Sequence, residues 1–233
     1  MAVRQFTVPE LGEISVYKRR KSKHIRISVD AHNKIKVSVP YWLPYQQGVK
    51  FAIQKTDWIL SKKHHIPRLA NGDKIGKFHR LSVTRGTGMR IITKVSDSEV
   101  IVFLPTSLET NSLSTQTAIR RACIRALKQE AESLLPQRLE TLSTRYDYNY
   151  KSLTIKHLKS RWGSCNNVKD ITLNCLLMQL TWAEIDYVIM HELAHTKHMA
   201  HNTDFWSEVL RTTPNYKEIK SHLAKQKPIV FGG

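Results

Sequence analysis

The sequence has few cysteines, no long apolar run and few acidic side chains. Its three cysteines, Cys123, Cys165 and Cys175, lie at unrelated spacings without a C-x-x-C pair, which predicts reduced thiols that bind no metal. No apolar stretch approaches the ~18 residues that a membrane-spanning helix needs. The first residues show no apolar signal segment, so we expect a cytoplasmic protein with no membrane partner.

Acidic side chains are scarce relative to basic ones. The chain has 19 Asp and Glu against 37 Lys and Arg, a net charge of +18 over 233 residues. Residues 1–110 hold 20 basic and 8 acidic side chains, whereas residues 111–233 hold 17 and 11. A basic surface attracts polyanions, so we expect non-specific nucleic-acid contact through the N-terminal region, where residues 18–23 are almost all basic. The alternative is a surface that only confers solubility.

Signatures of nucleotide and base recognition are also absent. The sequence contains no P-loop and no zinc-finger or helix-turn-helix pattern, which excludes P-loop chemistry and base-specific reading by those motifs. A Ser/Thr-rich stretch at 106–117 follows Pro105 and is typical of a linker. We therefore predict a basic, β-rich N-terminal region over 1–110 and a second domain over 111–233.

Hydrophobic periodicity predicts an α+β fold. Apolar and polar residues alternate on either side of a turn at 30–33, which predicts a β-hairpin, and Pro136 should kink or split a long helix. A second hairpin is expected from Ser160 to Asn174. The other predicted elements are a helix to about 63, strands at 78–84, 89–95 and 99–104, and the long helix at 115–145.

The pattern H-E-x-x-H at 191–195 carries the chemistry. On a helix, His191 and His195 share one face and can reach one metal ion, while Glu192 can take a proton from a metal-bound water. Thr181 and Glu184 form a capping-box pattern that predicts the start of this helix. Imidazole ligands with one open position favour a catalytic Zn²⁺.

A third protein ligand should complete this zinc site. The sequence offers His198, His201 and Glu208 as candidates. On a continuing helix His198 would lie about one further turn along, which is too far unless the helix ends. His201 gives the spacing of sites in which a turn brings the last histidine back to the metal.

Several motifs together resemble one family. They are S-R-W-G-S-C at 160–165, I-T-L-N at 171–174, H-E-L-A-H at 191–195, H-x-x-x-F-W at 201–206 and P-x-Y at 214–216. In this order they resemble the YgjP-like family of predicted metal-dependent hydrolases, which is related to SprT-like zinc metallopeptidases. The resemblance implies a zincin-like helical domain of the gluzincin type with a small sheet. It also implies that His201 is the third ligand.

The S-R-W-G-S-C motif allows two interpretations. Arg161 could bind an anionic or carbonyl group of the substrate, or it could pair with a helix carboxylate such as Asp186. Trp162 and Cys165 are expected in the core.

The combined prediction is a zinc-dependent metallopeptidase acting on a protein or peptide, with Glu192 as general base. One alternative is a metal-dependent phosphohydrolase acting on a nucleotide. Another is a nucleic-acid-binding module with a structural zinc, although such a site closes its fourth position and needs no base.

Overall fold

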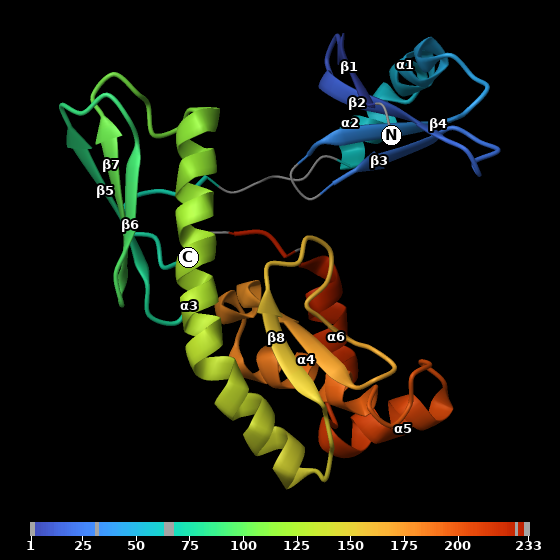
Figure 1. Ribbon diagram of the computed structural model, residues 1–233, viewed down its shortest axis with the longest axis vertical. Coiled ribbons are helices and arrows are strands. Elements are labelled where there is room, and N and C mark those ends of the chain that lie inside the picture. Colours follow the sequence, from blue (N-terminus) through green and yellow to red (C-terminus); the bar gives the residue numbers. More distant parts are fainter. Residues whose placement is uncertain (1–2, 31–32, 63–67, 227, 231–233) are drawn as a thin grey trace. The chain divides into compact units, whose positions relative to one another are not determined.

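The computed structural model describes residues 3–30, 33–62, 68–226 and 228–230. The chain forms two compact units, Met1–Ile66 and Pro67–Gly233, which are described separately (Figure 1). Helices and small sheets occur in both units, so the predicted α+β class is confirmed. None of the helices in the described ranges is long and apolar enough to cross a membrane.

The first unit is a four-stranded sheet with two helices. The predicted hairpin is present, because β3 pairs antiparallel with β4 from Val29 opposite Ile35. Helix α1 approaches the sheet closely at Gly48, where a Cβ atom would lie 2.8 Å from the side chains of Val16 and Val39. The sheet order is β1-β2-β4-β3, and the elements are β1 (Val3–Val8), β2 (Gly12–Arg19), β3 (Arg26–Val29), β4 (Ile35–Pro40), α1 (Tyr45–Gln54) and α2 (Thr56–Lys62).

The second unit begins with a three-stranded sheet that packs on a long helix. Its strands are β5 (Arg80–Gly86), β6 (Ile92–Val95) and β7 (Glu99–Pro105), in the order β5-β7-β6, and the helix is α3 (Leu113–Arg145). Leu81 and Val102 of the sheet share one buried core with Ile119 and Ala122 of α3. The division at Ile66–Pro67 therefore replaces the predicted boundary at 110, because these strands bury their apolar face against α3.

Helix α3 runs through Pro136 without interruption. The sequence predicted that this proline would kink or split the helix, and the split does not occur. Leu135 and Leu139 are fully buried on either side of the proline, so packing compensates for the missing backbone donor. Ser112 caps the start of the helix, since its side chain accepts a hydrogen bond from the backbone N–H of Thr115 at 3.2 Å.

The rest of the second unit contains a second small sheet and three α-helices. The predicted hairpin is confirmed, because β9 pairs antiparallel with β10, and β8 pairs parallel with β10 on the other side. The elements are β8 (Ser152–Lys156), β9 (Gly163–Cys165), β10 (Asp170–Asn174), a 3₁₀ helix η1 (Cys175–Gln179), α4 (Trp182–Ala194), α5 (Thr203–Thr212) and α6 (Tyr216–Lys225).

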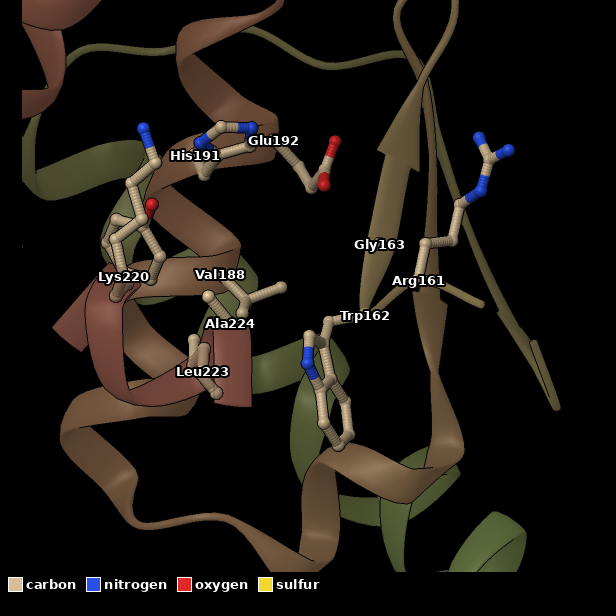
Figure 2. A pocket seen from close by; sticks show the side chains of 10 residues that line it. Arg161, Trp162, Gly163, Val188, His191, Glu192, Lys220, Leu223 and Ala224 are labelled. Atoms are coloured by element: carbon tan, nitrogen blue, oxygen red, sulfur yellow. The ribbon is translucent and has the colours of Figure 1, made fainter. Parts of the chain in front are cut away.

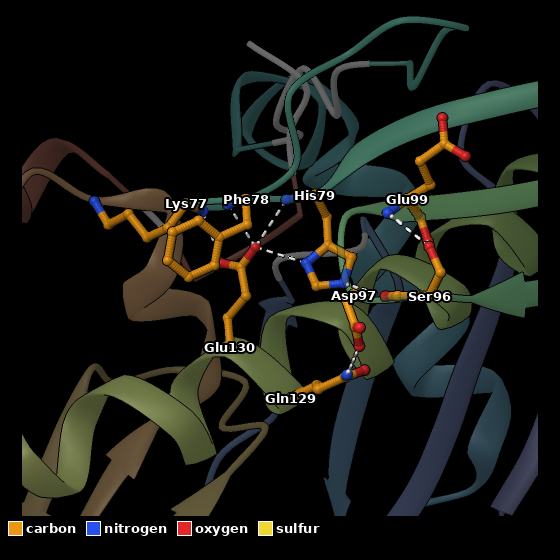
Figure 3. A network of polar contacts seen from close by, with 8 residues as sticks. All are labelled: Lys77, Phe78, His79, Ser96, Asp97, Glu99, Gln129 and Glu130. Carbon is orange, nitrogen blue, oxygen red and sulfur yellow. Dashed lines mark hydrogen bonds and ion pairs between the residues drawn. The ribbon is translucent and has the colours of Figure 1, made fainter.

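A buried carboxylate joins α3 to the segment that leads into β5. Glu130 is 2% exposed and accepts hydrogen bonds from the backbone N–H groups of Lys77, Phe78 and His79 at 2.7–2.9 Å (Figure 3). The His79 ring contacts the same carboxylate through Nδ1 at 2.7 Å, while its Nε2 donates to the Ser96 carbonyl at 2.8 Å. Burial raises the pKa of Glu130, but the bonds from His79 and the amides outweigh burial and lower its pKa.

Replacing Glu130 by Ala should destabilise the second unit strongly. Three amides and one imidazole would lose their acceptor in a buried site, so we expect the free energy of unfolding to fall by about 3–5 kcal/mol. The measurement is denaturant unfolding followed by circular dichroism. The control is Glu132→Ala on the same helix, where the Lys128 pair is about half exposed and should contribute less than about 1 kcal/mol. Equal losses in the two variants would contradict the role assigned to Glu130.

Candidate metal centre

Helix α4 begins at the predicted capping box. The Thr181 hydroxyl accepts from the backbone N–H of Glu184 at 3.3 Å, and the Glu184 carboxylate accepts from the backbone N–H of Thr181 at 2.8 Å. Ile185, Ile189 and Leu193 on this helix are fully buried. Because these side chains fix the rotation of the helix, its last turn can present polar groups in a defined direction.

The helix ends at the second histidine of the motif. Helix α4 stops at Ala194, and His195 occupies the C-cap position. The chain then turns and re-enters a helix at α5, where the Asn202 side chain accepts from the backbone N–H of Phe205 at 3.0 Å. This turn places His201, six residues after His195, beside the last turn of α4.

Three histidines converge at this turn. One ring nitrogen from each of His191, His195 and His201 lies within 4.8 Å of the others. The Nε2 atoms of His191 and His201 are 3.2 Å apart. Two nitrogens bound at 2.0–2.1 Å to a tetrahedral zinc lie about 3.3 Å apart, so the observed spacing fits two ligands of one ion.

The two other candidate ligands lie outside this cluster. His198 contributes its backbone carbonyl, which accepts a hydrogen bond from Nδ1 of His195 at 3.2 Å. Glu208 instead forms ion pairs with Lys197 at 3.1 Å and with Arg211 at 2.9 Å. These contacts lower the pKa of Glu208 to about 2, with the hydrogen bond from Arg211 as the largest cause.

His191 and His195 are held in the neutral form that binds metal. A carbonyl can only accept, so Nδ1 of His195 must carry the proton and Nε2 keeps its lone pair. Burial lowers the pKa of His191 to about 3, helped by the charges of His195 and His201. Burial also lowers the pKa of His195. Neutral imidazoles are the ligands that divalent transition metals require.

An aromatic stack orients the exposed ligand. The ring of Trp206 stacks on His201 with centroids 5.7 Å apart and on Tyr216 with centroids 5.3 Å apart. The Lys220 ammonium lies 3.9 Å from the centroid of the Trp206 ring. His201 is exposed, so few buried contacts could fix its ring. The stack with Trp206 therefore restricts the orientation of this ring.

Glu192 is buried beside the cluster. It is 5% exposed, and burial raises its pKa to about 8, with the charge of Arg161 acting in the opposite direction. Its Oε2 atom is buried without a hydrogen-bond partner among the described residues. Gly163 of β9 contacts this carboxylate so closely that a Cβ atom would lie 2.7 Å from Oε1. A larger residue at this position would therefore require the Glu192 side chain to shift.

The loop before β9 is fixed by Asn174. This residue is fully buried, and its side-chain amide donates to the carbonyls of Leu158 and Arg161 at 2.8 Å each. Asn174 is the last residue of the I-T-L-N motif, but the motif by itself indicates no role for it. A buried amide inside an apolar strand is the signal that could have indicated one, since it needs partners from elsewhere in the fold.

Of the two interpretations of Arg161, the pairing with Asp186 is not observed. Asp186 accepts from Arg138 of α3 at 2.6 and 2.5 Å instead. The long helix supplies this arginine, and periodicity within one segment could not reveal it. Trp162 and Cys165 are partly buried and pack against the core, close to the expectation for both.

A cavity of about 310 Å³ lies beside one of the three histidines, His191. Its lining includes His191 and Glu192 of α4, Arg161 and Trp162 before β9, and Lys220 and Leu223 of α6. In Figure 2, His191 and Glu192 lie between Lys220 and the strand that carries Gly163. Lys220 was not predicted, because no spacing relative to the histidines distinguishes it from other lysines.

Comparison with known protein families identifies the family to which the chain belongs. Residues 23–226 match the family described as "YgjP-like, metallopeptidase domain". The chain is a member of the YgjP-like metallopeptidase family. The recognition made from the motifs is confirmed, and membership implies a metal-dependent peptidase with a metal cofactor. The matched residues of this YgjP-like protein begin inside the first unit and extend to the end of the second.

Two solved structures show local likeness to this YgjP-like chain. The metallopeptidase zymogen abylysin of Pyrococcus abyssi is 28% identical, covering 39% of this chain and 91% of that one, with a TM-score of 0.36. The zymogen jannalysin of Methanocaldococcus jannaschii is 21% identical, covering 37% and 90%, with a TM-score of 0.34. TM-scores this low do not establish a shared fold. No curated protein matches the sequence at a significant level.

Metal content should separate His201 from His198. His201→Ala removes one of the three converging nitrogens, so the purified protein should hold far less metal after dialysis. His198→Ala keeps the backbone carbonyl that contacts His195, so its metal content should remain that of the wild type. Elemental analysis of both variants provides the measurement. A normal metal content in His201→Ala would contradict the ligand assignment.

Proposed function

We propose that this protein is a zinc-dependent peptidase with a zincin fold of the gluzincin type. The observation that carries the proposal is the convergence of three imidazoles next to the buried carboxylate of Glu192, whose Oε2 has no hydrogen-bond partner among the described residues, with His191 and Glu192 lining one cavity. His191, His195 and His201 would hold the metal. Glu192 would act on a water molecule beside it.

Zinc fits the available donors better than the common hard cations. Magnesium and calcium prefer oxygen ligands, whereas three imidazole nitrogens suit zinc. Three protein ligands leave one position open toward the cavity, which a structural site would close. When bound there, zinc would polarise the scissile carbonyl and make a neighbouring water more acidic.

Glu192 would move the proton. Its unpartnered Oε2 is available to accept a proton from water and to deliver it to the leaving amine. Burial favours the protonated acid, whereas a cation held by the histidines would favour the carboxylate that accepts the proton. The close approach of Gly163 leaves little space between this side chain and β9.

The strand beside Glu192 supports an extended peptide as the substrate. In the sheet order β8-β10-β9, β9 has a neighbour on one side only. A free strand edge can pair with the backbone of an extended peptide, and such pairing would bring a scissile bond past Glu192. Trp162 and Leu223 offer apolar surface in the adjoining cavity for a substrate side chain.

One observation favours a second candidate. Arg161 and Lys220 contribute two positive side chains to the same cavity as Glu192. Two cations beside a metal site would also suit the phosphates of a nucleotide. A nucleotide phosphohydrolase is therefore the alternative, with the same histidines and the same base.

The substitution Glu192→Gln tests the proposed chemistry. Glutamine has almost the same shape but cannot accept the proton, so we expect hydrolysis to fall by about 10²–10⁴-fold with the metal retained. Turnover is measured on the zinc-loaded protein with casein and, in parallel, with nucleoside triphosphates. Elemental analysis reports the metal in the same samples.

The two substrates distinguish the candidates. Cleavage of casein that depends on Glu192 supports the peptidase, whereas hydrolysis confined to the triphosphates supports the alternative. Wild-type turnover in Glu192→Gln would contradict both mechanisms.

A further inference from the structure

Cations and aromatic rings alternate on the surface of the first unit. The guanidinium of Arg4 lies 4.7 Å from the ring centroid of Tyr45, and the Lys18 ammonium lies 5.3 Å from the same centroid. Lys18 also lies 5.4 Å from the ring of Tyr41, and Arg20 lies 5.7 Å from it. We call these five residues, together with Trp42, the cationic-aromatic cluster.

The cluster has a rigid base. Lys18 Nζ donates to the Tyr41 carbonyl at 2.9 Å, which ties the end of β2 to the turn after β4. These two strands run parallel, with Lys18 opposite Val39 and Arg19 opposite Pro40. Tyr41 and Trp42 therefore lie on a turn that the sheet holds in place.

The acidic groups that follow two of the strands lie away from the cluster. Strand pairing places Arg4, Lys18 and Arg20 where β1 starts and β2 finishes. The acidic residues Glu10 and Asp30 follow the finishing ends of β1 and β3, toward the opposite end of the sheet. Asp30 is also paired with Lys36 at 3.4 Å.

The first unit also has a large positive net charge. Residues 1–66 contain 13 Lys and Arg and 4 Asp and Glu, a net charge of +9. Arg19, Lys21 and Lys23 follow or flank the cluster in the sequence, and none of them forms an ion pair within the described residues. A local field of one sign without acidic partners attracts polyanions.

Two rings of the cluster are open to solvent. Tyr41 is 57% exposed and Trp42 is 64% exposed. Exposed aromatic faces between cations form the combination with which proteins bind single-stranded nucleic acid, because bases stack on the rings and phosphates contact the cations. A duplex hides the faces of its bases, so it would use the charge but not the rings.

We propose that the cationic-aromatic cluster of the first unit binds single-stranded nucleic acid without base-specific reading. The bases stack on Trp42 and Tyr41. The phosphates contact Arg4, Lys18 and Arg20 of the cluster together with the flanking cations Arg19, Lys21 and Lys23. All of these residues lie in Met1–Ile66, so the proposal is independent of the hydrolytic site.

The charge component is tested by fluorescence anisotropy on the full chain. Labelled oligo(dT) and oligo(rU) of about 20 nucleotides would be titrated at several salt concentrations, since one such site covers about 4–16 nucleotides. In the variant Arg19→Gln, Arg20→Gln, Lys21→Gln, Lys23→Gln, the slope of log affinity against log salt should become shallower by about 2–3. The two oligonucleotides show whether DNA or RNA binds more tightly.

A matched variant controls for net charge. Lys34→Gln, Lys36→Gln, Lys50→Gln, Lys55→Gln removes the same four charges from other parts of this unit. It should retain most of the wild-type salt slope. Equal losses in the two fourfold variants would overturn the assignment to the cluster.

The stacking component is tested at Trp42. Trp42→Ala should weaken binding to the single strand by roughly 5- to 100-fold, and Trp42→Phe should retain most of the affinity, because either ring can stack on a base. The control is Trp58→Ala, which removes another exposed tryptophan, 45% exposed, from α2. It should leave the affinity unchanged.

Three results would overturn the proposal. The first is no binding to either oligonucleotide at low salt. The second is an affinity for duplex equal to that for the single strand, with Trp42→Ala binding like the wild type. The third is binding to phosphatidylcholine–phosphatidylserine vesicles without binding to oligonucleotides, which would assign the surface to a membrane. The zinc content of the same preparations should be unchanged in every variant.

Discussion

The end of helix α4 at Ala194 is the constraint on which the candidate metal centre depends. The buried side chains of Ile185, Ile189 and Leu193 fix how the helix is rotated, and its last turn then points His191 and Glu192 toward the cavity. Because the helix stops there, the chain can turn and bring His201 within 3.2 Å of His191. A helix continuing past His195 would have carried the following histidines away along its axis.

Buried polar groups hold in place segments that apolar packing alone would not position. Asn174 holds the loop before β9 through two backbone carbonyls, which in turn places Gly163 against Glu192. Glu130 performs a comparable role between α3 and the segment before β5. Such groups are costly to bury without partners, so each one specifies a single arrangement of the segments that it joins. Glu192 Oε2 is buried without a partner among the described residues, and it faces the site of the proposed chemistry.

The two units differ in what they offer to other molecules. The second unit carries the convergent histidines and a cavity of about 310 Å³. The first has a net charge of +9 and presents exposed rings among cations, without a comparable cluster of metal-ligating groups in its described residues. Family membership extends over both, since the match begins at residue 23. The proposed hydrolytic centre and the proposed nucleic-acid-binding surface therefore belong to different units of the chain.

The sequence by itself determined the features that depend on near neighbours. The capping box at Thr181, the hairpin at 26–40 and the placing of two histidines one turn apart all follow from spacings of a few residues. Only the tertiary structure decided the rest. The unit boundary lies at Ile66–Pro67 because β5–β7 bury their apolar face against α3, and Asp186 pairs with Arg138 from that same helix. These outcomes join residues tens of positions apart, and the packing that selects such partners exists only once the chain has folded.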